Sequence, residues 1–240
     1  MNKLADIQTQ PLNYELTHSL AEYEAGKVLL IDKPYGWTSF QAVNKIKYAI
    51  KHQFKKIIKI GHAGTLDPLA TGLLIVCTGK ATKTIDQIQA LPKEYTGTFF
   101  LGATTPCFDL EKEVDATYPT EHITNKLIYQ AAKDFEGDIM QTPPVFSAVK
   151  INGKRAYDYA RAGQEVEIKA KPITIYSFEV TKIEMPLLHF KIKCSKGTYI
   201  RSIARDFGLA LNSGAHLTSL RRTMIGEYNL SNVTNIKVDI

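Results

Sequence analysis

The sequence predicts an α+β domain whose central sheet is mostly antiparallel or mixed and is flanked by helices and loops. Segments with a strand pattern outnumber helical segments and mostly follow one another along the chain, which is typical of this class. The 240 residues are 44% hydrophobic and 22% charged, an ordinary globular composition with enough apolar material for a sizeable core. That length fits one large domain, or one domain with a small appendage.

The first predicted strand covers residues 27–32, an apolar run that is typical of a buried strand. The turn-forming residues 33–36 end it. Thr38 or Ser39 can then accept a hydrogen bond from the backbone and begin a helix. The apolar face of this helix is expected to comprise Phe40, Val43, Ile46 and Ile50.

The middle of the chain predicts a strand, a loop and a helix. Residues 95–101 form the strand, with every second side chain on one face. Residues 102–121 form an acidic loop. Helical spacing then predicts a helix over 121–136 that ends at Gly137. Its apolar positions are Ile123, Leu127, Ala131 and Phe135.

Two strands and a helix are predicted further along the chain. The strands cover residues 173–183 and 188–194, and the second alternates apolar with polar side chains. Residues 196–198 turn the chain into a helix that ends near Gly214. The inward positions of that helix are Ile203, Phe207 and Leu211.

Composition also limits which partners and which cellular compartment the sequence predicts. Thirty Lys and Arg against 24 Asp and Glu give a net charge of +6, a mild excess that favours a polyanionic partner without establishing one. Three widely separated cysteines have no metal-ligand spacing, and their odd number argues against a disulfide framework. The longest apolar run, residues 73–77, is too short to span a membrane. These features predict a cytoplasmic protein without membrane contact.

Two basic stretches are candidates for RNA contact. The first lies between Asp32 and Asp67, where there are seven lysines and no acidic residue. It fits either a solvated helix face or contacts to phosphates. The second, residues 147–171, mixes basic residues with tyrosines around a hairpin signal at Asn152-Gly153. It fits RNA contact and a plain surface hairpin equally well.

Residues 61–72 concentrate the features that suggest chemistry, because three glycines in so short a span favour tight turns or close approach to a ligand. Gly79-Lys80 follow this segment and suggest a phosphate-binding P-loop. That interpretation fails, since Ala81 stands where such a loop needs Ser or Thr. It also contains no zinc motif. Asp67 before Pro68 fits a helix start as well as a functional carboxylate. His62, taken alone, fits a structural histidine.

Residues 61–72, Gly-His-Ala-Gly-Thr-Leu-Asp-Pro-Leu-Ala-Thr-Gly, resemble the signature of the TruB pseudouridine synthases. Five further segments match this family in the same order, so the resemblance covers roughly residues 26–225. These segments are Leu29–Pro34, Lys93–Tyr95, Ser147–Lys150, Cys194–Arg201, and Gly214–Leu217 with Leu220–Arg222.

The resemblance implies a pseudouridine synthase fold and the isomerisation of uridine to pseudouridine in the TΨC loop of tRNA, at tRNA position 55. The reaction exchanges one bond of the base for another without redox or net hydrolysis, so neither a cofactor nor a metal is expected. The implied partner is the T-arm of tRNA. We expect a monomer that needs no obligate protein partner. An RNA-binding or RNA-folding module without chemistry is one alternative, and a tRNA-folding role is also compatible with catalysis. An aspartate-dependent hydrolase or phosphotransferase is a further alternative, disfavoured because the sequence lacks metal and phosphate ligands.

The same resemblance implies roles for individual residues. Asp67 would be the catalytic carboxylate, and Arg201 would pair with it. Tyr95 would stack on the target uracil, and Tyr199 would be a second active-site tyrosine involved in proton transfer. The expected substrate-binding residues are His62, which would assist base flipping, with Lys33, Pro34, Leu220 and Lys150. The adjacent Arg221-Arg222 would grip the RNA backbone.

The expected domain boundaries follow from the extent of the resemblance. Residues 1–25 form an N-terminal extension, with a short helix over 14–24. Residues 26–225 form the catalytic domain, including an RNA-gripping insertion at about 143–171. Residues 226–240 form a short tail, in place of the full C-terminal RNA-binding module that many family members carry.

Overall fold

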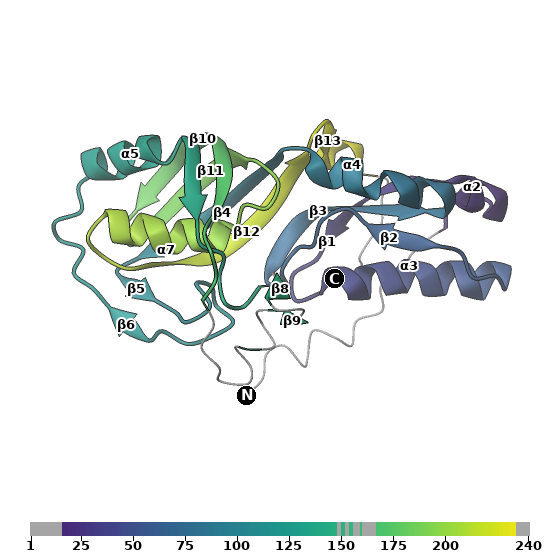
Figure 1. The fold of residues 1–240 in the computed structure, drawn as a ribbon, viewed down its shortest axis with the longest axis horizontal. Coiled ribbons are helices and arrows are strands. Elements are labelled where there is room, and N and C mark those ends of the chain that lie inside the picture. Colours follow the sequence, from purple (N-terminus) through teal and green to yellow (C-terminus); the bar gives the residue numbers. More distant parts are fainter. Residues whose placement is uncertain (1–15, 148–149, 152–153, 156–158, 160–166, 234–240) are drawn as a thin grey trace. The chain divides into compact units, whose positions relative to one another are not determined.

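The computed structural model describes residues 16–147, 150–151, 154–155, 159 and 167–233 (Figure 1). The chain divides into two compact units. Unit 1 comprises Met1–Glu94 and Arg221–Ile240, and unit 2 comprises Tyr95–Leu220. Each unit combines helices with paired strands, which confirms the predicted α+β class.

Unit 1 is built on the strand order β1–β3–β12, with β2 paired to β3 and β13 paired to β12. The β1–β3 and β2–β3 pairs are antiparallel. The strands are β1 (Val28–Lys33), β2 (Ile60–His62), β3 (Ala70–Thr78), the end of β12 (Ala215–Ile225) and β13 (Tyr228–Asn229). The helical segments are α2 (Leu20–Ala25), α3 (Ser39–Phe54), η2 (Gly79–Thr84), α4 (Ile85–Ala90) and η3 (Leu230–Asn232).

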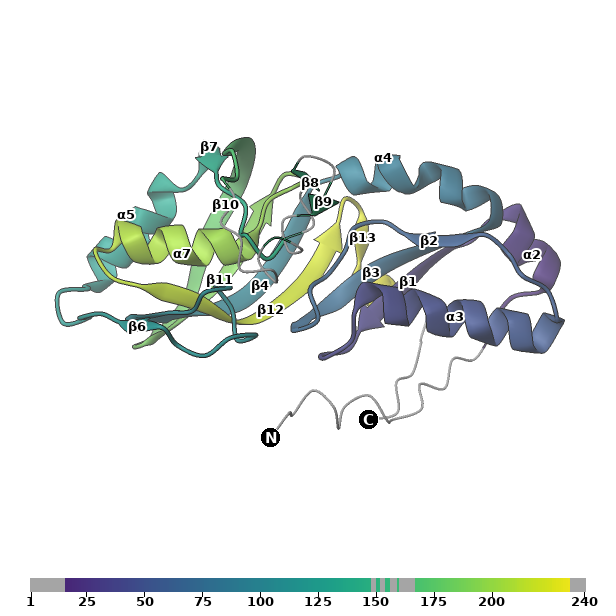
Figure 2. The ribbon, with the colours of Figure 1, turned by 60° about the horizontal axis from the view of Figure 1, so that its bottom comes forward.

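The core of unit 1 lies on both faces of its sheet, because successive strand residues point to opposite faces. Leu74 and Val76 of β3 pack with residues of β1, α2 and α3 on one face. Leu73 and Ile75 pack with Ile88 of α4 on the other. Figures 1 and 2 show α3 and α4 on opposite sides of these strands. β3 is therefore the buried centre of the unit.

Unit 2 contains the strand order β12–β4–β11–β10–β7, and its β10–β11 and β10–β7 pairs are antiparallel. Two small hairpins, β5–β6 and β8–β9, accompany this sheet. The strands are β4 (Lys93–Leu101), β5 (Ala103–Thr104), β6 (Ala116–Thr117), β7 (Gly137–Gln141), β8 (Lys150–Ile151), β9 (Lys154–Arg155), β10 (Lys171–Glu184) and β11 (Leu187–Cys194). The helices are α5 (Asn125–Asp134) and α7 (Ile200–Ala210).

Five phenylalanines form the centre of the unit 2 core. Phe99 of β4 lies 4.3 Å, centroid to centroid, from Phe190 of β11. Phe207 of α7 contacts Phe178 of β10 at 5.3 Å and Phe135 at 5.8 Å. Aromatic rings at such separations add to the stabilisation that comes from burial alone. They fix α7 on the sheet.

Most of the predicted elements are present. The strands predicted at 27–32, 95–101, 173–183 and 188–194 correspond to β1, β4, β10 and β11. The helix after 196–198 is α7, and its predicted inward residues are buried. The acidic loop contains the short β5–β6 hairpin, which was not predicted. The predictions also omitted β3, β7 and β12 as strands.

Two predicted core residues are wrong. Phe40 is 68% exposed on α3, where Ala42 is buried instead. Leu127 is 46% exposed on α5, where Ile128 is buried instead. Phe40 lies about 120° around the helix from Ile46, so both cannot face the same core. Helix phase is set by the whole apolar stripe, and a single large side chain does not override it.

The predicted N-terminal extension contributes to unit 1. Ser19 and Glu22 form a reciprocal capping box that begins α2. Tyr23 of α2 is fully buried in the core beside α3. Residues 1–15, where the predicted 14–24 helix would begin, lie outside the described residues. None of the described helices has both the length and the apolar character that crossing a bilayer requires.

Candidate active site

The segment 61–72 joins two strands of unit 1 through an irregular loop. β2 ends at His62, and β3 begins at Ala70. The Ala70 N–H donates to the carbonyl oxygen of Asp67 over 3.1 Å, which closes a turn at Asp67-Pro68. Asp67 therefore does not begin a helix, and the helix-cap interpretation is wrong. Its half-buried side chain is held in a loop between two paired strands.

A buried lysine fixes the turn at Asp67-Pro68. Lys33 at the end of β1 is 0% exposed, and its ammonium donates to the carbonyl oxygens of Pro34 (2.9 Å), Trp37 (2.6 Å) and Pro68 (3.3 Å). An ammonium has three N–H donors, so these three acceptors match its capacity. Lys33 and Pro34 were predicted to bind substrate. The structure places the Lys33 side chain beneath the loop, as a support for its backbone, and contact of Lys33 or Pro34 with substrate stays a prediction.

Burial lowers the pKa of Lys33 from 10.5 to about 8. The negative charge of Asp67 partly opposes this effect, whereas the positive charge of Arg222 adds to it. The Asp67 carboxylate is thus close enough to Lys33 to influence its titration electrostatically.

Ser39 provides a second support at the start of α3. Its hydroxyl donates to the Leu66 carbonyl oxygen over 3.0 Å and accepts from the Leu66 N–H over 2.8 Å. Ser39 is 2% exposed, so both hydrogen bonds are shielded from water. The residue before Asp67 therefore has both backbone groups tied to one side chain.

Arg222 provides the third support and corrects a prediction. Its side chain is 1% exposed and donates to the carbonyl oxygens of Leu73 (2.8 Å), Gly64 (3.0 Å) and Thr65 (3.4 Å). An RNA-gripping role for Arg222 is therefore wrong, because the guanidinium faces backbone inside unit 1. The neighbouring Arg221 lies on the surface and pairs with Asp32 at 3.0 and 2.5 Å.

His62 lies at the end of β2, where it pairs with Val76 of β3. Its ring is half-buried, and its Nδ1 has no hydrogen-bond partner among the described residues. Burial lowers the pKa of His62, and the charge of Arg222 lowers it further against the opposing hydrogen bond to the Gly64 backbone. The imidazole is therefore neutral at pH 7.

Unit 2 carries the other predicted catalytic residues. Tyr95 lies on β4 and is 8% exposed. Leu220 lies on the part of β12 that belongs to unit 2 and is half-buried. Tyr199 is the residue immediately before α7, and Arg201 lies in the first turn of that helix. Within unit 2, the fold therefore anchors these side chains on two strands and one helix.

Gln141 holds the start of α7 and was not predicted from the sequence. Its amide oxygen accepts from the Tyr199 N–H over 2.8 Å, and its amide nitrogen donates to the Tyr199 carbonyl oxygen over 3.1 Å. Gln141 is 2% exposed. In the first turn of α7, the Ser202 hydroxyl also donates to the carbonyl oxygen of Thr142, the residue after Gln141, over 2.8 Å. The backbone of Tyr199 is thus locked to the end of β7.

Arg201 is 5% exposed and makes several contacts inside unit 2. Its guanidinium donates to the carbonyl oxygens of Phe146 (3.0 Å) and Cys107 (3.4 Å), and lies 3.5 Å from the Asp109 carboxylate. Asp109 is a carboxylate partner that sequence reasoning missed. Its distance of 92 residues along the chain from Arg201 leaves no local signal. The expected pairing with Asp67 stays a prediction.

Lys150 lies in the β8–β9 hairpin, where it pairs with Arg155. This pairing of the flanking strands agrees with the predicted hairpin, whose turn residues Asn152-Gly153 lie outside the described residues. The side chain of Lys150 lies outside the described part of the chain, so its contact with substrate stays a prediction. Among the described residues, His, Cys, Asp and Glu side chains form no group of three or more that could hold a metal ion.

Comparison with known proteins identifies the family of this chain. Residues 51–200 match the TruB family pseudouridylate synthase (N terminal domain). The tRNA pseudouridine synthase B of Flavobacterium johnsoniae is 59% identical over 217 residues, which cover 90% of this chain and 95% of that protein. The tRNA pseudouridine synthase B of Phocaeicola vulgatus is 57% identical over 216 residues, covering 90% and 92%.

Solved structures give the same result for the fold. A crystal structure of a Cbf5–Nop10–Gar1 complex matches with a TM-score of 0.64 and 31% identity, covering 88% of this chain and 51% of that chain. An H/ACA RNP bound to a substrate RNA matches with a TM-score of 0.62 and 27% identity, covering 91% and 56%. This chain thus spans little more than half of those longer chains. It belongs to the TruB family of pseudouridylate synthases.

Proposed function

We propose that this chain converts the uridine at position 55, in the TΨC loop of tRNA, to pseudouridine, with Asp67 as the catalytic carboxylate. The names of its relatives support tRNA as the substrate. The observation that carries the proposal is the support of the Asp67 loop. Side chains from β1, α3 and β12 hold the backbone around a carboxylate that is itself only half-buried.

This arrangement suits the chemistry of the reaction. The N1–C1′ bond breaks, the same C1′ bonds to C5, and the C5 proton is lost as N1 gains one. An ionised carboxylate can attack C1′ or the base, or it can remove the ribose 2′ proton. In each case a loop that does not rearrange keeps the carboxylate aligned with the reacting atoms.

The target base must leave its stack before the carboxylate can reach the sugar. Extruding a nucleotide costs a few kcal/mol. In the proposal, Tyr95 offers its ring to the everted uracil, and stacking of this kind returns about 1–3 kcal/mol per base. Leu220 adds an apolar wall, and His62 occupies the space that the base leaves.

The remaining assignments concern the charge of Asp67, the transfer of a proton and contact with the RNA. A guanidinium near a carboxylate keeps it ionised when a base covers it and excludes water. We assign this role to Arg201, and we assign transfer of the C5 proton to Tyr199. Lys33 supports the loop, Pro34 lies next to it in the chain near the substrate, and Lys150 lies on the hairpin of the RNA-gripping insertion at 143–171. The enzyme would act on tRNA in the cytoplasm as a monomer.

Asp67→Asn tests the proposal, with Asp86→Asn as its control. Asp86 is an exposed carboxylate on α4 of the same unit. Base-resolved mapping of a tRNA transcript should show pseudouridine with the wild type and the control, and none with Asp67→Asn, which should still bind tRNA. Undiminished modification by Asp67→Asn contradicts the catalytic assignment. A wild type that binds tRNA without modifying it supports the alternative of a non-catalytic RNA-binding module.

A further inference from the structure

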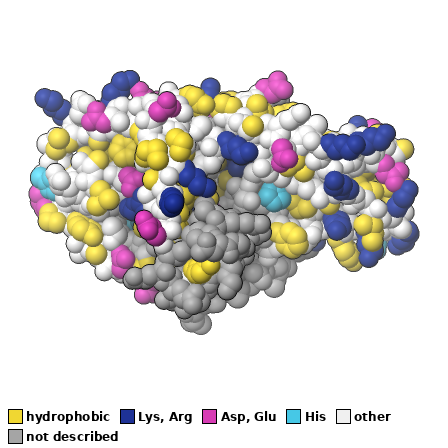
Figure 3. Space-filling model, in the orientation of Figure 1, with side chains coloured by type: hydrophobic (Ala, Val, Ile, Leu, Met, Phe, Trp, Pro, Cys, Tyr) yellow, Lys and Arg dark blue, Asp and Glu magenta, His cyan; other side chains and the backbone are white. Residues whose placement is uncertain are grey.

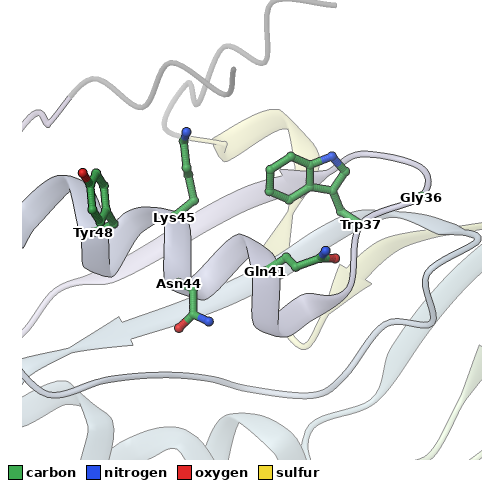
Figure 4. A pocket seen from close by; sticks show the side chains of 6 residues that line it. All are labelled: Gly36, Trp37, Gln41, Asn44, Lys45 and Tyr48. Carbon is green, nitrogen blue, oxygen red and sulfur yellow. The ribbon is translucent and has the colours of Figure 1, made fainter. Parts of the chain in front are cut away.

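A groove runs along the outer side of α3 in unit 1. It encloses about 340 Å³ and is lined by Gly36, Trp37, Gln41, Asn44, Lys45 and Tyr48. Four of these residues lie on α3 itself, from Gln41 to Tyr48, and each is three or four residues from another. Their side chains therefore share one face, opposite the core face of the helix. In Figure 4 the Trp37 and Tyr48 rings rise on the same side of α3, with the Lys45 side chain between them. We call these six residues the α3 groove.

The aromatic rings in the α3 groove are not part of the core. Tyr48 is 66% exposed and stacks on His52 with ring centroids 6.1 Å apart. Trp37 precedes the helix and is half-buried. Flat rings left open to solvent beside a cation are what unpaired nucleobases recognise, since every base has a face that can stack.

The chain segment that forms the α3 groove carries charge of one sign. Between Asp32 and Asp67 there is no acidic residue, while α3 carries Lys45, Lys47 and Lys51. Within the described part of the chain, Lys45 forms no ion pair, so its charge faces the groove uncompensated. Figure 3 shows Lys and Arg side chains gathered over the end of unit 1 that holds α3. This charge complements a phosphodiester chain.

One end of the α3 groove lies against the Asp67 loop. The Gly36 N–H donates to the Pro68 carbonyl oxygen over 2.9 Å, and the Lys33 ammonium bonds both Trp37 and Pro68. A strand of RNA that reaches Asp67 can therefore pass directly onto α3. From Gln41 to Tyr48 the helix rises about 10 Å, which is long enough for more than one nucleotide of a single strand.

We infer that the α3 groove binds unpaired nucleotides of the substrate tRNA, outside the target uridine, by stacking their bases on Trp37 and Tyr48 and pairing a phosphate with Lys45. Gln41 adds hydrogen-bonding capacity, because the helix cap engages its amide oxygen and leaves the amide nitrogen as a donor. The inference rests on the proposed function only in taking tRNA as the substrate. It adds a second contact that positions the RNA on unit 1.

The test compares two double variants of the full chain. Lys45→Ala/Tyr48→Ala removes the cation and one ring of the groove. Lys126→Ala/Tyr129→Ala is the matched control, because both residues are exposed on α5 at the same spacing. The groove variant should weaken binding of a full-length tRNA transcript on the order of tenfold. Its salt dependence, log Kd against log salt, should lose about 0.7–0.9 in slope for the lost phosphate.

The control variant should match the wild type in both dissociation constant and salt slope. Equal tRNA affinity for the groove variant and the control overturns the inference. So does a groove variant that melts at lower temperature with unchanged affinity, since another segment of this chain would then fill the groove. The proposed function is judged separately, by whether the wild type forms pseudouridine. The two ideas can therefore fail independently.

Discussion

The guanidinium of Arg222 donates a hydrogen bond to the carbonyl oxygen of Gly64 over 3.0 Å, across 158 residues of sequence. The same side chain bonds Leu73 and Thr65, so it bridges the start of the loop before Asp67 and the strand after it. A planar group with five N–H donors can serve three backbone acceptors at once. The adjacent Arg221 is instead partly exposed and pairs with Asp32.

We expect Arg222→Lys to destabilise the protein by about 2–4 kcal/mol, because a lysine leaves buried carbonyl oxygens without donors. The melting temperature should fall by roughly 5–15 °C. Arg221→Lys is the control, since its exposed pair with Asp32 contributes at most about 1 kcal/mol. Thermal unfolding of both variants checks this. Equal effects of the two substitutions contradict the role given to Arg222.

The lowered pKa of Lys33 predicts how stability changes with pH. Between pH 8 and 10.5 the folded protein has released the Lys33 proton that the unfolded chain still holds. Because the unfolded state then binds more protons, the free energy of unfolding rises with pH, by up to about 1.4 kcal/mol per unit. Below pH 8 the buried ammonium costs stability.

Denaturant titrations of the wild type and Lys33→Met at several pH values measure this contribution. The difference in free energy of unfolding should move in favour of the wild type as pH rises above 8. Lys83→Met, at an exposed lysine of η2, should run parallel to the wild type. If the free energy of unfolding of Lys33→Met also changes with pH in parallel with the wild type, the pKa of Lys33 is not near 8.

Gly72 and Gly137 offer a matched pair, because both have φ near +100°. A Cβ at Gly72 would lie 2.3 Å from the Arg222 carbonyl oxygen, whereas a Cβ at Gly137 would meet nothing within 4 Å. Gly137→Ala should therefore cost only the backbone strain, about 1–2 kcal/mol. Gly72→Ala should cost about 4 kcal/mol or more, because backbone must shift as well. Similar losses of stability in the two variants contradict this argument.

Gln141→Glu tests whether the backbone lock on Tyr199 matters for the reaction. The carboxylate still accepts from the Tyr199 N–H, but only its protonated form can donate to the Tyr199 carbonyl oxygen. Burial raises the pKa of such a carboxyl. At pH 8.5 the modification rate of Gln141→Glu should be on the order of a hundredfold below that of the wild type. As pH falls to 5.5 the rate relative to the wild type should recover, because the protonated carboxyl donates again.

Single-turnover rates at saturating enzyme measure that recovery. Gln87→Glu, on the exposed side of α4, should keep a constant ratio to the wild type over the same range. A ratio for Gln141→Glu that is low and independent of pH indicates a purely structural role. This prediction rests on the role proposed for Tyr199.

Local patterns were enough to predict much of the fold. β1 opens with four consecutive apolar residues, β11 alternates strictly, and α7 shows a clear helical stripe, so each can be recognised from its own residues. β12 has an irregular burial pattern and contains Thr, Ser and two Arg, so its pairing with distant strands could not be foreseen. Its structure depends on its neighbours rather than on its own propensities.

The supports of the candidate site were harder to predict than its reactive residues. Family resemblance pointed to Asp67, but the groups that hold its loop bond to backbone carbonyl oxygens, which every residue possesses. Arg221 and Arg222 look identical in sequence, yet one is buried and the other is exposed, because neighbouring residues on a strand face opposite sides. Only the fold distinguishes them.

The separation between Gly64 and Arg222 also bears on how the protein is made. Unit 1 takes its last strand from residues that follow all of unit 2. During synthesis, the segment around Asp67 leaves the ribosome long before the arginine that completes its scaffold. Since domains generally fold as whole units, the nascent chain holds an unfinished unit 1 until the end of β12 has been made. We therefore expect a chain that terminates before β12 to lack a complete unit 1 and to be inactive.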